Sequence, residues 1–60
     1  MNMNIPRDPA MLLSFINLKL RDFYPSLDAL CQDMDIDMQS VKDSLASIDY
    51  EYDEAGNQFV

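Results

Sequence analysis

Apolar residues recur at helical spacing in the first part of the chain and predict a helix from about Pro9 to Phe23. Asp8 can accept hydrogen bonds from free backbone N–H groups at its start, and Pro9 suits the first helical position. Pro25 ends the helix, because a proline ring disfavours helical geometry at the preceding residue. The side that we expect to face the core carries Leu12, Leu13, Ile16, Leu20 and Phe23.

A second apolar stripe on the same helix consists of Met11, Phe15 and Leu18. Contiguous exposed apolar surface marks interaction sites, so we interpret this stripe as a candidate protein-binding surface for a partner helix or a second copy of the chain. The alternative is that the N-terminal arm folds back over the stripe and buries it. The apolar residues of that arm are Met1, Met3 and Ile5.

Two shorter helices are predicted over 27–34 and 38–47, with only a few residues between them. Ser26 and Asp37 are favourable residues for capping their starts. Their apolar positions, which keep the helical period, are Leu27, Leu30, Cys31, Met34, Met38, Val41, Leu45 and Ile48. The turn between them contains no glycine, so Asp35 would have to take left-handed backbone geometry, which aspartate tolerates better than most residues.

Beyond the third helix the period of the apolar positions changes to two, which predicts a strand. The apolar members of this alternation are Ile48, Tyr50 and Tyr52. The segment from Asp53 to Gly56 has the composition of a tight turn, in which Gly56 can take a positive φ. The sequence therefore predicts a hairpin over about 49–60.

The pairing register of this hairpin depends on the length of its loop. A three-residue loop places Phe59 opposite Glu51, whereas a two-residue loop places Phe59 opposite Tyr52. We favour the second register because it puts the phenylalanine ring on the packed face.

Together these elements predict a mainly α fold. We expect one small domain over 1–60, formed by a three-helix, helix-turn-helix-like bundle with a short C-terminal β-hairpin. This arrangement is winged-helix-like. A chain of 60 residues supports only one core, since it buries only about 60% of its unfolded surface. Hydrophobic residues make up 48% and charged residues 25%, as in globular proteins. No apolar run approaches the length of a membrane span or forms a signal peptide, so we expect a cytoplasmic protein without membrane contact.

The net charge of −7 bears on the choice of partner, because helix-turn-helix proteins commonly bind nucleic acid. Eleven acidic residues stand against four basic ones. Proteins that hold duplexes neutralise several phosphates, and an acidic field opposes even the encounter. Gln39 and Lys42 on the third helix could touch base edges, but Asp43 lies beside them. We therefore expect a protein partner or self-association, and no nucleic acid.

Two alternatives stay open beside this leading hypothesis of a non-enzymatic protein-interaction module. One is a winged-helix nucleic-acid-binding regulator that dimerises and confines its cations to one side. Those cations are Arg7, Lys19, Arg21 and Lys42. The other is an acidic mimic of DNA that occupies the DNA site of another protein. Its acidic residues would include Asp49, Glu51 and Asp53.

Three alternating carboxylates, Asp33, Asp35 and Asp37, match the opening of a calcium loop. The rest of that motif is missing, because Met38 stands where the sharp turn needs glycine and Ser44 where a bidentate glutamate is required. We interpret the segment as a solvated acidic corner that caps the third helix, and we expect no metal site.

Catalytic chemistry has little support in the composition. The chain has no histidine, so its serines and its single cysteine lack their commonest activating base. Cys31 lies on the apolar side of the second helix, which favours a buried small hydrophobe over a reactive thiol. We expect no enzyme, no catalytic or cofactor-binding residues and no cofactor.

Several segments carry a resemblance to a known family. They are Ile5-Pro6, Asp8-Pro9, Met11-Leu12-Leu13, Lys19-Leu20-Arg21-Asp22-Phe23-Tyr24, Ser26-Leu27, Ser47-Ile48-Asp49-Tyr50-Glu51-Tyr52-Asp53 and Asn57-Gln58-Phe59-Val60. Over nearly every residue the chain resembles a family of short bacterial proteins catalogued as a domain of unknown function. The resemblance implies a free-standing bacterial protein and no assigned activity. The stretch 26–60 also resembles winged-helix regulators in topology, and such a likeness does not license a function.

Overall fold

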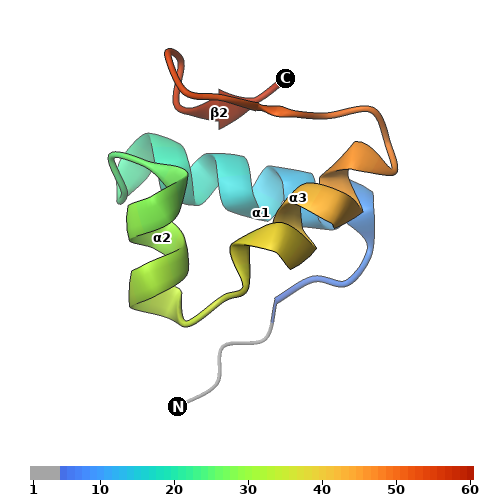
Figure 1. The fold of residues 1–60 in the computed structure, drawn as a ribbon, viewed down its shortest axis with the longest axis horizontal. Coiled ribbons are helices and arrows are strands. Elements are labelled where there is room, and N and C mark those ends of the chain that lie inside the picture. The colour runs from blue at the N-terminus through green and yellow to red at the C-terminus, as the bar shows by residue number, and fades with distance from the viewer. Residues whose placement is uncertain (1–4) are drawn as a thin grey trace.

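Three helices and a two-stranded antiparallel hairpin form the protein in the computed structural model, which describes residues 5–60 (Figure 1). The elements are α1 (Pro9–Asp22), α2 (Leu27–Met34), α3 (Met38–Ala46), β1 (Tyr52–Asp53) and β2 (Gln58–Phe59). This arrangement confirms the predicted fold class. The sequence placed the end of α1 and the end of α3 one residue too late and gave the bounds of α2 correctly.

Each helix begins at the cap residue that the sequence predicted. The caps are Asp8 for α1, Ser26 for α2 and Asp37 for α3. In each case a side-chain oxygen accepts a hydrogen bond from the backbone N–H three positions later, at 3.1, 3.1 and 3.0 Å respectively. Local sequence thus determines where the helices start, because a capped first turn satisfies one of the N–H groups that the helix leaves free.

The turn between α2 and α3 uses an aspartate in left-handed geometry. Asp35 has φ 56° and ψ 50°, which confirms the prediction for this residue. The N–H of Ile36 donates to the carbonyl oxygen of Cys31 at 2.9 Å, which is one of the two bonds that define a Schellman helix end. The turn is thus closed without the glycine that helix ends usually employ.

A second left-handed aspartate ends α3 and corrects the predicted start of the hairpin. Asp49 has φ 68°, and the N–H of Tyr50 donates to the carbonyl oxygen of Leu45 at 2.9 Å. The prediction that the hairpin begins at about residue 49 was therefore wrong, since the chain is still closing the helix there. The alternation of Ile48, Tyr50 and Tyr52 is nevertheless present, and all three residues pack against the core.

The hairpin has the register that buries Phe59. Tyr52 lies opposite Phe59, and their ring centroids are 5.4 Å apart. The next pair is Asp53 with Gln58, so the four residues 54–57 form the turn where the sequence predicted a two-residue loop. The register is confirmed, and the strands stop one pair earlier than expected.

Gly56 does not have the positive φ that the sequence predicted for it. Asn57 takes that conformation instead, with φ 52°. A Cβ at position 56 would lie 2.8 Å from Oδ2 of Asp53, so a larger residue there would displace the side chain of Asp53. That oxygen accepts a hydrogen bond from the N–H of Gly56 at 3.2 Å, so the turn is closed by a side chain that approaches the backbone.

The core is formed by residues from all three helices and from β2. Its buried members are Leu12, Ile16, Leu20, Leu27, Leu30, Cys31, Val41, Leu45 and Phe59. Phe23 was predicted in the core and is 66% exposed, so that prediction was wrong. The residue is the C-cap of α1 with φ −127°, and its departure from helical geometry removes it from the core-facing side.

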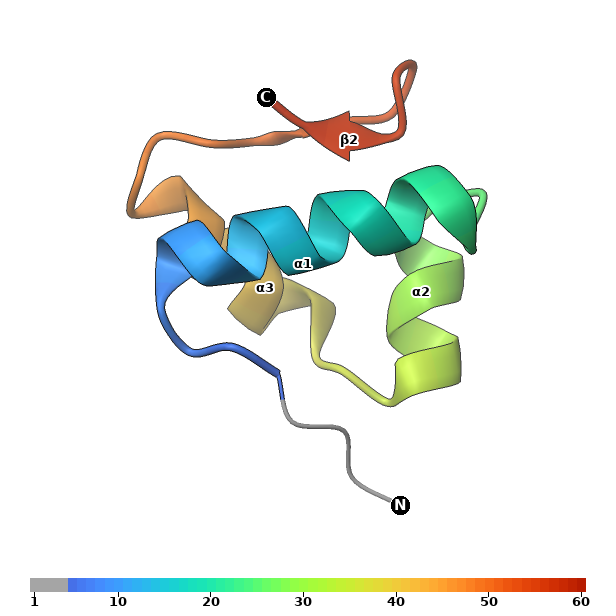
Figure 2. The ribbon, with the colours of Figure 1, turned by 180° about the vertical axis from the view of Figure 1, so that it is seen from behind.

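The hairpin packs along α1. Its strand β2 lies on the α1 side and the segment of β1 lies on the α3 side, as the two opposite views show (Figures 1 and 2).

Asn57 fixes the tip of this hairpin. Its Nδ2 donates to the carbonyl oxygens of Leu20 at 3.1 Å and Tyr24 at 3.0 Å. Its Oδ1 accepts from the hydroxyl of Tyr52 at 2.7 Å, and that hydroxyl accepts from the N–H of Leu27 at 3.2 Å. One side chain thus connects the end of α1, the start of α2 and β1.

Candidate functional site

The outer side of α1 is the candidate site, because no other described segment crosses it (Figure 2). Met11 is 62% exposed and Leu18 is 44% exposed. Phe15 is half-buried and packs against the core from the same helix. The structure thus leaves two of the three predicted residues open to solvent, and the third forms part of the support beneath them.

Phe23 extends this apolar surface beyond what the sequence predicted. Nζ of Lys19 lies 5.5 Å from the ring centroid of Phe15 and 5.0 Å from that of Phe23. A cation over two aromatic faces is attracted to both rings and keeps them side by side. We call Met11, Phe15, Leu18 and Phe23 the α1 face. The feature of the sequence that could have indicated the exposure of Phe23 is its position just before Tyr24-Pro25, where the helix has to end.

An ion pair lies next to this face. Nε of Arg21 is 3.0 Å from Oδ1 of Asp22, and a second guanidinium nitrogen is 3.2 Å from Oδ2. The hydrogen bond to Arg21 lowers the pKa of Asp22, and the same bond raises the pKa of Arg21. Both side chains are exposed, so this pair neutralises charge beside the α1 face and contributes little to stability.

The described part of the N-terminal arm does not cover Met11 or Leu18. Ile5 lies in a groove with Leu12, Ile36 and Val41, on the side of α1 that meets α3. The prediction that the arm could bury the second stripe also involved Met1 and Met3, which lie outside the described residues.

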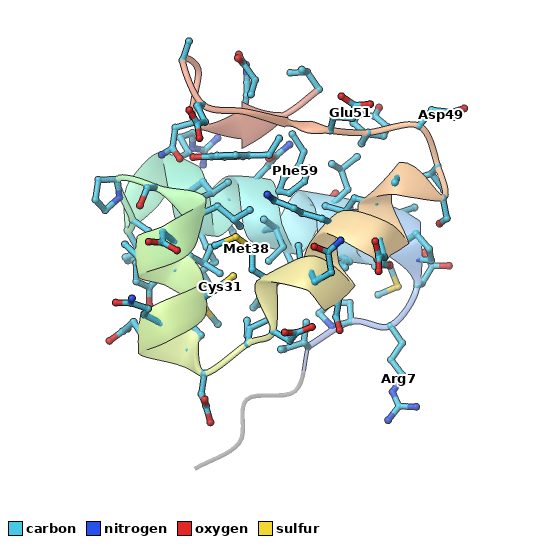
Figure 3. The ribbon with its side chains drawn as sticks, in the orientation of Figure 1. Arg7, Cys31, Met38, Asp49, Glu51 and Phe59 are labelled. Carbon is cyan, nitrogen blue, oxygen red and sulfur yellow. The ribbon has the colours of Figure 1, made fainter. Side chains whose placement is uncertain are left out.

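Charge is unevenly distributed along the chain. Three of the four basic residues precede Pro25, together with only two of the eleven acidic ones. After Pro25, nine carboxylates stand against Lys42 alone. The α1 face therefore belongs to a nearly neutral part of the protein, whereas α2, α3 and the hairpin carry the negative charge. Figure 3 shows Asp49 and Glu51 together on the hairpin side and Arg7 at the opposite end.

The outer side of α3 offers little to a nucleic acid. Nε2 of Gln39 donates to Oδ1 of Asp43 at 2.9 Å, so this candidate base-reading side chain is already bonded. Lys42 lines a groove together with Asp43, Glu51 and Glu54. Of the other cations, Lys19 and Arg21 lie on α1, and Arg7 lies on the arm, where it lines a groove with Ser40 and Ser44 of α3.

The three carboxylates of the acidic corner have separate roles. Asp33 accepts a hydrogen bond from the hydroxyl of Tyr24 at 2.6 Å, Asp35 forms the left-handed turn, and Asp37 caps α3. Within residues 5–60, no group of histidine, cysteine, aspartate and glutamate side chains is arranged to hold a metal ion. The thiol of Cys31 is buried, and burial raises its pKa, as does the charge of Asp28 to a smaller extent.

No helix among the described residues has both the length and the apolar character needed to cross a membrane. Comparison with curated proteins gave no match, and comparison with solved structures gave none either. The family model described as Domain of unknown function (DUF4250) matches residues 6–59 and so covers every helix and both strands. The chain therefore belongs to the DUF4250 family, a domain of unknown function.

Proposed function

We propose that this protein is a non-enzymatic protein-interaction module that binds its partner through the α1 face. The observation that carries the proposal is the exposure of Met11 and Leu18 on the outer side of α1 and of Phe23 at its C-cap, at 62%, 44% and 66%. Burial of apolar surface is the main favourable term in protein association. They are three of the four large apolar side chains that are exposed within residues 5–60, the fourth being Val60.

The charge distribution indicates the chemistry of the partner. Lys19 is the one charge over the aromatic rings of the α1 face, and the neighbouring Arg21 is paired with Asp22, so an apolar helix or strip that covers Met11 and Leu18 desolvates little charge. The rest of the protein carries the excess of carboxylates, which attracts partners of positive charge over longer distances. We therefore propose a partner protein with an apolar contact surface and a net positive charge.

A protein partner is also favoured over nucleic acid by the positions of the cations. Lys19 lies over two aromatic rings, Arg21 is paired with Asp22, and Lys42 lies among carboxylates. Arg21 and Lys42 thus have carboxylates beside them, which oppose contact with phosphates. A bacterial source and a cytoplasmic location belong to the same proposal, and the resemblance to short bacterial proteins and the buried free thiol of Cys31 support them.

The test replaces Met11 or Leu18 with aspartate and measures co-purification of a partner from native cells. Phe15→Asp is unsuitable, because Phe15 packs against the core and its loss would also destabilise the fold. Val60→Asp is the matched control, since Val60 is 59% exposed and lies on the hairpin. Circular dichroism verifies that each variant is folded.

We expect the unmodified protein and Val60→Asp to retain the same partner, and Leu18→Asp and Met11→Asp to lose it. Sedimentation of the purified protein identifies the case in which the partner is a second copy, which would support binding through the α1 face and rule out the positive net charge proposed for the partner. If all four proteins recover the same set of partners, or if the unmodified protein recovers none and sediments as a monomer, the proposal is wrong.

A further inference from the structure

The two outer edges of the hairpin differ in their hydrogen bonds to the rest of the protein. Glu51 and Val60 exchange both main-chain hydrogen bonds, at 3.0 and 2.9 Å. Tyr52 and Phe59 form the next pair, and in such a pair the main-chain groups point away from the partner strand. Asn17 bonds both outward groups of Phe59. Within residues 5–60, neither the N–H nor the carbonyl oxygen of Tyr52 has a hydrogen-bond partner.

A groove runs along this open edge of β1. It is formed by two adjoining hollows that share Lys42, Tyr52 and Glu54. The first hollow lies between α3 and β1, and the second continues past Met38 to the start of α2 at Ser26. Figure 3 shows Met38 and Phe59 between the hairpin and the helices. The edge is therefore bordered by a helix on one side and is open to an extended chain.

The walls of this groove are strongly acidic. Four carboxylates line its two hollows, against the single cation Lys42. They are Asp28, Asp43, Glu51 and Glu54. Exposed sheet edges pair readily with foreign strands, and natural proteins usually block them with lysine, proline or a covering segment. Here the residues on either side of β1, Glu51 and Glu54, are glutamates, which attract a positively charged chain and repel a second copy of this acidic protein.

We propose that the outer edge of β1 binds an extended lysine- and arginine-rich segment of a partner protein, which adds as a third strand. The main chain of that segment bonds the N–H and carbonyl oxygen of Tyr52, and its basic side chains lie among the carboxylates of the groove. The hydroxyl of Tyr52 is held by Leu27 and Asn57, so this strand is fixed before binding. This site is separate from the α1 face.

The experiment titrates ¹⁵N-labelled protein with a capped peptide of four Lys-Thr repeats at low salt and follows amide chemical shifts. Threonine favours the extended form and the lysines supply charge. In two further peptides the backbone nitrogens are methylated, at all lysines in one peptide and at all threonines in the other. Only alternate residues of an added strand face the edge, so one methylated peptide loses its hydrogen bonds to Tyr52 and the other retains them.

We expect saturable shifts centred on the amides of Tyr52 and Glu54, and at least a tenfold difference in dissociation constant between the two methylated peptides. Glu54→Gln and Asp43→Asn should weaken binding severalfold, and Lys42→Gln should strengthen it. Asp22→Asn removes the same charge from α1 and should change the affinity much less.

Equal binding of the two methylated peptides would overturn the proposal, because it would show attraction by charge alone. Shifts centred away from β1, or the absence of saturation, would overturn it as well. Leu18→Asp should bind the unmethylated peptide as the unmodified protein does. The edge site and the α1 face can therefore fail independently, and a failure of one leaves the other to be judged by its own experiment.

Discussion

The side chain of Asn17 on α1 pairs with the main chain of Phe59 in β2 as a neighbouring strand would. Its Nδ2 donates to the carbonyl oxygen of Phe59 at 3.2 Å, and its Oδ1 accepts from the N–H of Phe59 at 2.8 Å. The two residues are 42 positions apart in the sequence. This pair closes the edge of β2 and attaches the hairpin to α1, so that the ring of Phe59 stays in the core.

Asn17→Ala should lower the free energy of unfolding by about 1–3 kcal/mol, because it leaves the main-chain groups of Phe59 without partners. Urea denaturation at neutral pH measures the change. Ser14→Ala, at an exposed position of the same helix, should change the free energy of unfolding by less than about 0.5 kcal/mol. Equal effects of the two substitutions would show that the pair does not hold the hairpin.

Asp35→Gly should raise the free energy of unfolding by about 0.5 kcal/mol. Left-handed geometry costs an L-residue about 1–2 kcal/mol, and part of the gain is offset by the greater freedom of glycine in the unfolded chain. Gln32→Gly, inside α2 at an exposed position, should lower the free energy of unfolding by about 0.5–1 kcal/mol. Thermal melting of both variants gives the comparison, and a destabilised Asp35→Gly would contradict the role given to the turn.

Tyr24 should ionise at higher pH than a free tyrosine. The hydrogen bond to Asp33 raises its pKa above the usual 10.0, with smaller contributions from burial and from the charge of Asp33. Since the folded pKa is the higher one, this bond contributes its full stabilisation below the pKa of the unfolded chain, and the contribution disappears as pH rises through the folded pKa. NMR titration of the Tyr24 ring carbons should show a lower pKa in Asp33→Ala. An unchanged pKa would mean that the bond is absent in solution.

Random duplex DNA should not bind the protein at low salt, where electrostatic binding is strongest. The carboxylates around Lys42 and the net charge of −7 oppose phosphate contacts. Fluorescence anisotropy of a labelled duplex measures this directly. Binding that weakens steeply with added salt would favour the nucleic-acid-binding alternative instead.

Local signals in the sequence were sufficient to predict the helices and their cap residues. A cap acts on the next three residues, and helical periodicity repeats within one segment, so neighbouring residues carry the information. The register of the hairpin could also be predicted, because only one of the two pairings considered buried Phe59. The bonds of Asn17 to Phe59 and of Asn57 to Leu20 and Tyr24 could not be predicted, since these partners are 33 to 42 positions away.

Sequence alone placed the candidate site only in part. Helical spacing correctly separated Met11 and Leu18 from the core side of α1, because angular position on a helix follows directly from residue number. It could not show that Phe15 is half-buried, which depends on what packs against its ring. Nor did it predict the exposure of Phe23, which depends on how the chain turns at the end of the helix.

The most direct measurement of the central proposal is photo-crosslinking from the α1 face in native cells. A photoreactive amino acid is introduced at Leu18 in one variant and at Val60 in another, and the adducts are identified by mass spectrometry. We predict a defined protein adduct from position 18 that is absent from position 60. Identical adducts from both positions, or an adduct with nucleic acid from position 18, would contradict the proposal that the α1 face binds protein.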